Sequence, residues 1–529
     1  MNRRDLLRLG AAGVGLAAAP RAAGAFVPAH RWDGYDWGTA PSVADRLNQG
    51  PFPQYPPEEV LPGSGVVMAT TPSREVVAGY GMGLVAYMTG DYAGETFQGA
   101  AASMEKHIDD LARLPMVQKL YVRPIWRDLQ KRPGRLDPDP YWRATFDAAR
   151  RYSKRVGFRV MMSSPDTRAP ALPDFLREKV PMVRLKGEWK RHGREAERAP
   201  AFYEEPRYDH PAFQEAFQEL NGLLAAELDG NPLVEYVDTF MYGFWGEGHT
   251  WPFTNNPFPD DATAERTWVR MFEVQLEHWK KTPLVTNTQP DFSRVGNSEL
   301  VDRTIRSHNW LRSDTIYIEN EQIEALSNRP PWVAAVLEVS MSDGRPETME
   351  IDEGVSITDN AIAHVMDVGA NYWSVWNWHD EKAENVLRYY AARPEMIDTI
   401  ARRIGYRVRP SWIWAYGGGG GDGGDDKGQT GLVVGFANDG IAGVPGVLRV
   451  TVKDAAGRVL ISGGLDPGWP VPGKIRQARL PLPPGTAWEG LRLAAELEVK
   501  GLRHPVRWAC HQRLEEDGSL RLRRTKGVD

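Results

Sequence analysis

Two glutamates stand directly after apolar stretches of the sequence, where a carboxylate must have either a partner or a task. Glu247 lies in Trp245-Gly246-Glu247-Gly248-His249, after the run Tyr236 to Phe244. Glu338 follows the wholly apolar run Val333-Ala334-Ala335-Val336-Leu337. Burying an ionised carboxylate costs several kcal/mol unless something compensates. Such a pair suits general acid–base and nucleophilic chemistry, although each glutamate could also simply pair with an arginine.

The two glutamates are far apart in the chain, so a regular set of strands must bring them together. From residue 66 short β-type runs alternate with amphipathic stretches whose apolar residues recur at spacings of three and four. This alternation is typical of parallel strands joined by crossover helices, and eight such units predict a (β/α)8 barrel. The candidate strands are Leu84–Met88, Lys119–Ile125, Arg159–Ser163, Tyr236–Phe244, Pro283–Thr286, Thr315–Glu319, Trp332–Val339 and Asn371–Trp376.

The strand count assigns positions to the candidate carboxylates. Active sites of such barrels lie at the carboxyl ends of the strands. Glu247 is then just beyond the fourth strand, and Glu338 is near the end of the seventh. Glu319, which ends the sixth strand, is the main rival of Glu338 and takes its role if the count is one strand out.

The chain divides into four predicted parts, with the fold class α/β: a (β/α)8 TIM barrel followed by a small all-β sandwich domain. Residues 1–25 contain Arg3-Arg4, a short apolar run and Ala23-Gly24-Ala25, which indicate a twin-arginine signal peptide. An extended lead segment, 26–65, precedes the catalytic barrel, 66–408, and the sandwich domain, 409–529, contains a glycine-rich loop at 417–424. We therefore expect a periplasmic or secreted protein, exported by the twin-arginine route.

Composition argues against several classes of partner and cofactor. The net charge of −6 provides no basic field for nucleic acid, and no stretch beyond the signal is long and apolar enough to hold the mature protein in a membrane. Cys510 is the only cysteine, which excludes an intrachain disulfide and cysteine-based metal sites. The histidines at 249, 308, 364 and 379 lack metal-ligand spacing. We expect no metal and no cofactor, and the oligomeric state stays open.

The sequence around Glu247 resembles that of a known enzyme family. Asp209 through Pro232, then Val237-Asp238 and Gly243 through His249, are similar to the fourth-strand region of clan A glycoside hydrolases of the β-galactosidase-like kind. The second unit, Arg123 through Leu129 and then Pro133 through Asp137, is similar to the strand-two segment of that family. A fainter similarity extends from about residue 84 through 406 into the sandwich domain.

The resemblance implies a retaining glycoside hydrolase that cleaves a β-linked glycan or oligosaccharide by double displacement. In that mechanism one carboxylic acid protonates the departing oxygen while a carboxylate attacks the anomeric carbon, the two groups being about 5 to 5.5 Å apart. Glu247 corresponds to the acid/base and Glu338 to the nucleophile. The acid needs a raised pKa and the nucleophile a lowered pKa, so their surroundings must differ.

Further residues are assigned to the binding of a carbohydrate substrate. By the same resemblance, Arg123 holds the nucleophile ionised, Tyr317 bonds to it, and Trp376 or Trp378 forms the floor of the sugar site, although each could instead be structural. The chain has 19 Trp, and indole rings both pack in large cores and stack on sugar faces. The residues expected to contact substrate are Arg123, Trp126, Trp245, His249, Trp251, Asn309, Tyr317, Glu319, Trp376 and Trp378.

The sequence departs from the family at one position, and two other functions stay open. The family has an Asn before the acid/base that contacts the 2-hydroxyl of the sugar, whereas this chain has Gly246. Either Asn309 or Asn287 provides that contact, or the sugar is bound differently. The first alternative function is a non-catalytic carbohydrate-binding protein on a degenerate barrel, and the second is a metal-dependent hydrolase that uses Asp and His at the barrel mouth.

Overall fold

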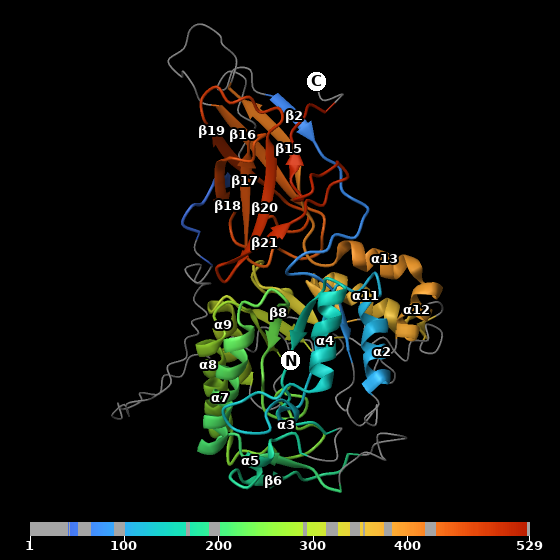
Figure 1. Cartoon of the computed structure of the whole chain (residues 1–529), viewed down its shortest axis with the longest axis vertical. Coiled ribbons are helices and arrows are strands. Elements are labelled where there is room, and N and C mark those ends of the chain that lie inside the picture. The colour runs from blue at the N-terminus through green and yellow to red at the C-terminus, as the bar shows by residue number, and fades with distance from the viewer. Residues whose placement is uncertain are drawn as a thin grey trace, which may run out of the picture. The chain divides into compact units, whose positions relative to one another are not determined.

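Figure 1 shows the computed structural model, and all the residues that it describes lie within the unit Asp36–Asp529. The predicted signal peptide lies outside the described residues, as does 418–424 of the predicted glycine-rich loop. The described residues are 41, 43–50, 65–88, 101–165, 170–189, 201–288, 294–313, 326–338, 350–352, 355–374, 383–417 and 430–525.

Eight parallel strands of the described chain close a barrel, as predicted. The closing pair joins the last strand to the first, with Tyr372 opposite Gly83. Short apolar runs buried on both faces suit a parallel sheet that helices cover on the outside. In chain order the strands are β3 (Gly83–Tyr87), β4 (Lys119–Val122), β5 (Arg155–Phe158), β8 (Val234–Asp238), β9 (Leu284–Asn287), β10 (Trp310–Ser313), β11 (Ala335–Leu337) and β14 (Tyr372–Ser374).

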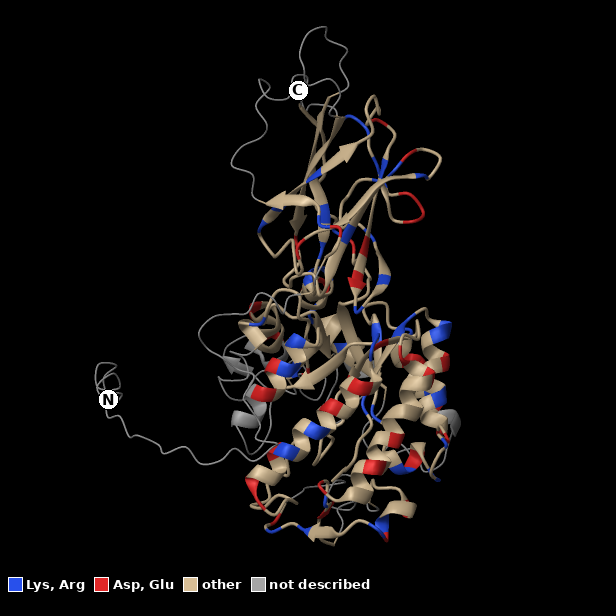
Figure 2. Ribbon diagram, turned by 90° about the vertical axis from the view of Figure 1, so that its left-hand side faces the viewer, with Lys and Arg blue, Asp and Glu red and all other residues tan. Residues whose placement is uncertain are grey.

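Amphipathic helices connect the barrel strands, and acidic and basic residues are interspersed along them (Figure 2). Helix α7 buries Phe213, Phe217 and Leu224 along one face. Helix α4 begins after Asp139, whose side chain accepts a hydrogen bond from Trp142 N at 2.6 Å. None of the described helices is long and apolar enough to cross a membrane. The helices are α2 (Ala101–Ala112), α3 (Trp126–Leu129), α4 (Pro140–Arg151), α5 (Asp174–Arg177), α7 (Pro211–Leu228), α8 (Asp261–His278), α9 (Arg294–Arg306), α11 (Ile357–Val368), α12 (Ala383–Ala392) and α13 (Pro394–Arg403).

Two of the predicted strands are wrong in position. The third strand is β5, which ends at Phe158, so the predicted segment 159–163 follows the strand and makes only single bridges, such as Met161 with Ile125. The sixth strand is β10, whereas the predicted segment 315–319 lies outside the described residues. Both true strands carry a charged residue in a run of four, which hides the apolar pattern that sequence analysis relies on.

The C-terminal region forms antiparallel sheets, as predicted. One sheet has the order β1-β19-β16-β15-β2 and the other β18-β17-β20-β21, with β22 paired to β20. Both sheets contribute to one apolar cluster, for example through Val434 and Leu497. The strands are β15 (Val408–Tyr416), β16 (Thr430–Asn438), β17 (Val447–Lys453), β18 (Val459–Gly464), β19 (Ile475–Leu482), β20 (Arg492–Val499), β21 (Leu502–Val506) and β22 (Leu520–Arg521).

The segment before the barrel contributes two strands to this sandwich. Strand β1 (Asn48–Gly50) pairs with β19, and β2 (Gly65–Ala69) pairs with β15. The predicted boundary at residue 66 assigns β2 to the barrel, but its partner is in the sandwich. Two small hairpins complete the described strands: β6 (Met182–Arg184) with β7 (Glu204–Pro206), and β12 (Glu350–Asp352) with β13 (Val355–Ser356).

A buried carboxylate organises the amino-terminal end of the barrel. Oε1 of Glu235, on β8, lies 2.8 Å from Lys119 Nζ and accepts hydrogen bonds from Tyr372 OH at 2.8 Å and Gly81 N at 2.9 Å. Its Oε2 lies 3.4 Å from Arg155 Nη1. Burial alone would raise the pKa of Glu235, but Lys119 and Arg155 outweigh this effect and lower it. The carboxylate is therefore paired, not a free buried charge.

The sandwich packs against the same end of the barrel. His504, on β21, stacks on Tyr80 with ring centroids 3.6 Å apart. Burial lowers the pKa of His504 to about 4, so its imidazole is neutral at pH 7. Lys500 donates from Nζ to the Trp279 carbonyl at 3.0 Å and to Asn309 Oδ1 at 2.9 Å. The sandwich thus covers polar groups at the barrel end away from the candidate site.

Replacing Glu235 by glutamine should lower the free energy of unfolding by about 3 to 5 kcal/mol, because Lys119 would stay buried without a carboxylate. Urea unfolding followed by circular dichroism measures the loss. Glu215→Gln, on the exposed face of α7, is the matched control and should change stability little. Equal stability of the two variants would show that the Glu235 cluster does not hold this end of the barrel.

Candidate active site

Glu247 is held by a tight loop that follows β8. The loop runs from Gly243 to Gly248, and Gly246 has a φ of 73°, in the left-handed region that favours glycine. A Cβ at Gly243 would lie 2.1 Å from the His249 carbonyl oxygen, so the turn cannot close with a larger residue there. Glu247 N donates to the Phe244 carbonyl at 3.0 Å. The loop thereby fixes a glutamate that is only 5% exposed at the carboxyl end of the strand.

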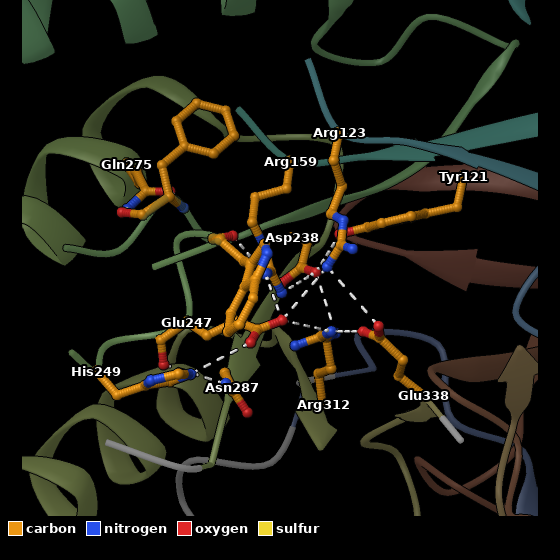
Figure 3. Close-up of polar contacts among 12 residues, drawn as sticks. Tyr121, Arg123, Arg159, Asp238, Glu247, His249, Gln275, Asn287, Arg312 and Glu338 are labelled. Atoms are coloured by element: carbon orange, nitrogen blue, oxygen red, sulfur yellow. Dashed lines mark hydrogen bonds and ion pairs between the residues drawn. The ribbon is translucent and has the colours of Figure 1, made fainter. Parts of the chain in front are cut away.

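Glu338 reaches the same end of the barrel from β11. It is the residue directly after this strand, and its backbone N donates to the Ser313 carbonyl on β10 at 3.0 Å. Its side chain is buried, with 4% of the residue exposed. The predicted meeting of Glu247 and Glu338 across the barrel mouth is present in the structure (Figure 3).

Arginines join the two glutamates. Arg123 Nη1 lies 3.4 Å from Glu247 Oε1 and 3.7 Å from Glu338 Oε1, so these oxygens cannot be farther apart than the sum of the two distances. Arg312 Nη2 lies 3.3 Å from Glu247 Oε1 and is also in direct contact with Glu338 Oε2. Figure 3 shows this guanidinium between the two carboxylates. One nitrogen therefore contacts both candidate reacting groups.

Asp238, the last residue of β8, forms ion pairs with two of the arginines. Its Oδ2 lies 2.5 Å from Arg159 Nη2 and 3.2 Å from Arg312 Nε, and it accepts a hydrogen bond from Tyr121 OH at 2.5 Å. Arg159 Nη1 extends to Glu247 Oε1 at 3.1 Å. Among the described residues the site thus sets three guanidinium groups against three carboxylates, and each positive charge has a partner.

His249 and the three arginines together determine the protonation state of Glu247. Burial alone would raise the pKa of Glu247, but the hydrogen bond with His249 and the charges of Arg159, Arg312 and Arg123 hold it well below its usual range. His249 Nε2 faces the other carboxylate oxygen, Oε2, at 3.4 Å. In the unliganded protein Glu247 is therefore a carboxylate at neutral pH, in contrast to the raised pKa expected of an acid. It can act as a base or nucleophile directly, and as an acid only after it gains a proton.

Two tryptophans predicted to contact sugar lie at this rim. Trp245 immediately precedes Gly246 in the loop, and its ring centroid lies 5.7 Å from that of His249. Trp251 is 63% exposed, and its ring centroid lies 6.4 Å from that of Trp189. Exposed and half-buried indoles beside a carboxylate suit the stacking of a sugar face. Whether they bind substrate stays a prediction.

Two other predicted contacts are wrong. Trp126 is fully buried in α3, where its Nε1 donates to Gln130 Oε1 at 2.8 Å and its ring meets Phe213 edge-on, so it is a core residue. Asn309 precedes β10 at the amino-terminal end of the barrel, where its Oδ1 accepts from Leu284 N at 2.9 Å. Trp126 is therefore enclosed in the core, and Asn309 lies at the barrel end away from the candidate site. Tyr317, Glu319, Trp376 and Trp378 lie outside the described residues.

Sequence reasoning missed Arg159, Arg312 and Asp238. Arg159 stands between Phe158 and Val160, and a charge inside an apolar run was the available signal. Arg312 belongs to the strand that the sequence placed too far along the chain. Within the described residues no group of three or more His, Cys, Asp or Glu side chains is arranged to hold a metal ion.

Several solved structures are similar to this chain at low sequence identity. An endo-glycoceramidase II from Rhodococcus sp. is 11% identical, with 77% of this chain and 99% of that chain covered and a TM-score of 0.35. The catalytic domain of a beta-amylase from Paenibacillus polymyxa is 9% identical, with coverages of 61% and 99% and a TM-score of 0.38. An exo-beta-1,4-mannosidase from Opitutaceae bacterium strain TAV5 is 12% identical, with 60% of each chain covered and a TM-score of 0.36. No protein-family model and no curated protein matches the chain. Its function must therefore be argued from the site.

Another buried carboxyl, that of Glu205, lies behind the loop that carries Glu247. Glu205, on β7, is in contact with Ser163 Oγ through Oε1 and accepts from Tyr208 OH at 2.6 Å through Oε2. Tyr208 OH in turn accepts from Gly243 N at 2.9 Å. Burial raises the pKa of Glu205 to about 7, against the opposing effect of these hydrogen bonds. The group binds its proton more tightly in the folded protein than in the unfolded chain.

Glu205 should make the protein less stable as pH rises. Its folded pKa of about 7 exceeds the ordinary 4.5, so its contribution is fully present below pH 4.5 and is lost as pH rises through 7. Urea unfolding at pH 5 and pH 8 should show wild type losing on the order of 3 kcal/mol relative to Glu205→Gln, which mimics the protonated carboxyl. The same pH dependence in both proteins would refute the assignment.

Proposed function

We propose that this chain is a retaining glycoside hydrolase that cleaves a β-linked glycan or oligosaccharide with Glu338 as nucleophile and Glu247 as acid/base. The observation that carries the proposal is the contact of one nitrogen, Arg312 Nη2, with both carboxylates. Retaining enzymes hold their two carboxyl groups about 5 to 5.5 Å apart, and inverting enzymes about 6.5 to 9.5 Å apart. Two carboxylates that share one nitrogen favour the shorter spacing.

The surroundings of each glutamate fit the steps of this reaction. Arg312 and Arg123 place positive charge beside Glu338, which suits a carboxylate that attacks the anomeric carbon and forms a covalent glycosyl-enzyme. The leaving oxygen takes a proton from Glu247 in that step. Glu247 then removes a proton from water, whose oxygen attacks the anomeric carbon and releases Glu338. The ionised state of Glu247 in the free protein is the state required for this second step.

The first step needs a proton on Glu247. The oxygen that faces His249 Nε2 is Oε2, whereas all three arginines approach Oε1. A proton held between Glu247 Oε2 and the imidazole therefore avoids the guanidinium groups. We assign to this pair of atoms the delivery of the proton, with His249 as the partner that positions it.

The same charge balance also favours a second candidate, a non-catalytic protein that binds carbohydrate. Three arginines matched by three carboxylates form a stable network without any substrate. In this alternative Glu247 and Glu338 accept hydrogen bonds from sugar hydroxyls, and the rim tryptophans stack on the rings. Binding of oligosaccharide without release of an aryl leaving group by wild type would favour this function over hydrolysis.

Glu338→Gln should lower kcat on aryl β-glycosides by about 1,000-fold or more while substrate binding persists, because the amide cannot form the covalent intermediate. Release of the aryl group measures turnover, and isothermal titration calorimetry measures binding. Glu215→Gln on the surface of α7 serves as the control with wild-type activity.

Glu247→Ala should slow poor leaving groups most, because a good leaving group departs without a proton. Added azide should partly restore the rate and yield a β-glycosyl azide, since azide attacks the glycosyl-enzyme without a general base. Wild-type rates in both the Glu338 and Glu247 variants would refute the assignment.

We also propose that the protein is exported by the twin-arginine route, on the basis of Arg3-Arg4 and the Ala23-Gly24-Ala25 site. Replacing both arginines by lysine should leave most of the protein unprocessed in the cytoplasm of a host that has this pathway. Cell fractionation and amino-terminal sequencing measure the outcome, and the wild-type mature chain should begin at residue 26. Equal export of the twin-lysine form would contradict the proposal.

A further inference from the structure

Asn287 and Arg312 form a matched pair beside the reacting carboxylates. They are register partners on the adjacent parallel strands β9 and β10, so their side chains emerge side by side from the same face of the barrel. Each residue is only 1% exposed. Asn287 Nδ2 donates to the Glu247 carbonyl at 3.2 Å, and Arg312 Nη2 lies 3.3 Å from Glu247 Oε1. Figure 3 shows both side chains reaching toward this glutamate.

Each of the two side chains keeps one buried polar atom without a hydrogen-bond partner. These atoms are Arg312 Nη1, a donor, and Asn287 Oδ1, an acceptor. The amide orientation is fixed, because the Glu247 carbonyl can only accept and must therefore face Nδ2. A buried group without a partner costs about 1 to 3 kcal/mol, so two complementary ones on register partners of adjacent strands point to a ligand group that both accepts and donates.

The position of this pair identifies the part of a sugar that it would meet. Arg312 Nη1 is bonded to the same carbon as Nη2, the nitrogen in contact with Glu247 and Glu338. A group bound at Nη1 is therefore next to the reacting carbon, which lies between the two carboxylates. The anomeric carbon has the ring oxygen, which only accepts, on one side and C2 on the other. Only the C2 hydroxyl can both accept from Nη1 and donate to Oδ1.

The loop that carries Glu247 explains why a residue other than the one at position 246 must contact the 2-hydroxyl. The residue before Glu247 is Gly246, and a Cβ added there would lie 3.0 Å from Arg159 Cδ, in a backbone conformation that strains other residues. Arg159 thus takes the space that a side chain at position 246 would need. A recognition group on the neighbouring strands β9 and β10 is free of this restriction.

We propose that Asn287 and Arg312 both form hydrogen bonds with the 2-hydroxyl of the substrate, so that the enzyme acts on sugars with a free hydroxyl at C2. The inference rests on the proposed glycosidase function. A carboxylate or sulfate at this position would satisfy Nη1 but set a negative charge against Asn287 Oδ1. A 2-deoxy sugar would leave both atoms without a partner. The two residues therefore determine specificity for a neutral 2-hydroxy sugar.

The test compares aryl glycosides that carry a 2-hydroxyl, no substituent, or a 2-acetamido group. The measured quantity is the ratio of kcat/KM on the 2-hydroxy substrate to that on the 2-deoxy substrate. In Asn287→Ala and in Arg312→Lys this ratio should fall by about 10- to 100-fold from wild type, because the hydrogen bonds of Oδ1 and Nη1 with substrate form only when the 2-hydroxyl is present. A loss of loop positioning alone would slow both substrates equally and leave the ratio unchanged.

Thr286→Val is the matched control. Thr286 is adjacent to Asn287 on β9, but its hydroxyl accepts from Thr304 of α9 at 2.7 Å and so points away from the barrel interior. The control should keep the wild-type ratio, and thermal unfolding of all variants checks that each one is folded. If Asn287→Ala fails to fold, Asn287→Ser provides the same comparison.

The outcomes separate the inference from the function on which it rests. A ratio unchanged in both variants, or faster wild-type cleavage of the 2-acetamido substrate than of the 2-hydroxy substrate, overturns the inference while hydrolysis still supports the glycosidase. No turnover by wild type on any aryl glycoside overturns the proposed function and the inference with it. A ratio that falls in both site variants and not in Thr286→Val supports both.

Discussion

The guanidinium of Arg312 is the group on which the geometry of the site depends. It contacts Glu338 and Glu247 through Nη2 and Asp238 through Nε, so it draws together carboxylates from β8, the loop after β8, and β11. Buried carboxylates would repel each other strongly without such a cation. A planar guanidinium can bridge several oxygens at fixed angles, which an ammonium cannot do. The spacing of the two glutamates is therefore set by an arginine, and the backbone brings only the strand ends near one another.

The barrel carries a buried charge system at each end, and the two have different surroundings. The Glu235 cluster joins residues at the beginnings of β4, β5, β8 and β14 and is covered by the sandwich through Tyr80 and His504. The Glu247 cluster joins residues at the ends of strands, and its ion pairs come from residues of the barrel. Stability and recognition can thus reside at opposite ends of one barrel, as is usual for this fold.

The sequence predicts the barrel well because parallel strands and crossover helices leave a strong alternating pattern. It also points to Glu247 and Glu338, since each is a polar residue that follows an apolar run, whereas Arg123 was singled out only through the family resemblance. The sequence does not show which end of the barrel a side chain occupies or whether the side chain is enclosed in the core. Asn309 lies at the end away from the candidate site, and Trp126 is a core residue.

Arg159 and Arg312 were missed for a different reason. Arg159 begins the predicted third strand but was given no role there, whereas Arg312 fell in a connection because the predicted sixth strand starts at Thr315, beyond β10. The ion pairs that justify burying them come from glutamates and an aspartate distant in sequence, and no local pattern encodes those partners.

The arginine cluster has opposite effects on the two requirements of an acid catalyst. By lowering the pKa of Glu247 it reduces the fraction of molecules that carry the proton. The same charges stabilise the carboxylate that forms as the proton moves to the leaving oxygen, so each protonated molecule transfers its proton more readily. In the proposed reaction, Glu247 regains its negative charge while positive charge develops on the sugar, and Glu338 approaches from the other side. The cluster therefore favours the transition state at the expense of the protonated ground state, which is the direction in which differential binding must act for catalysis.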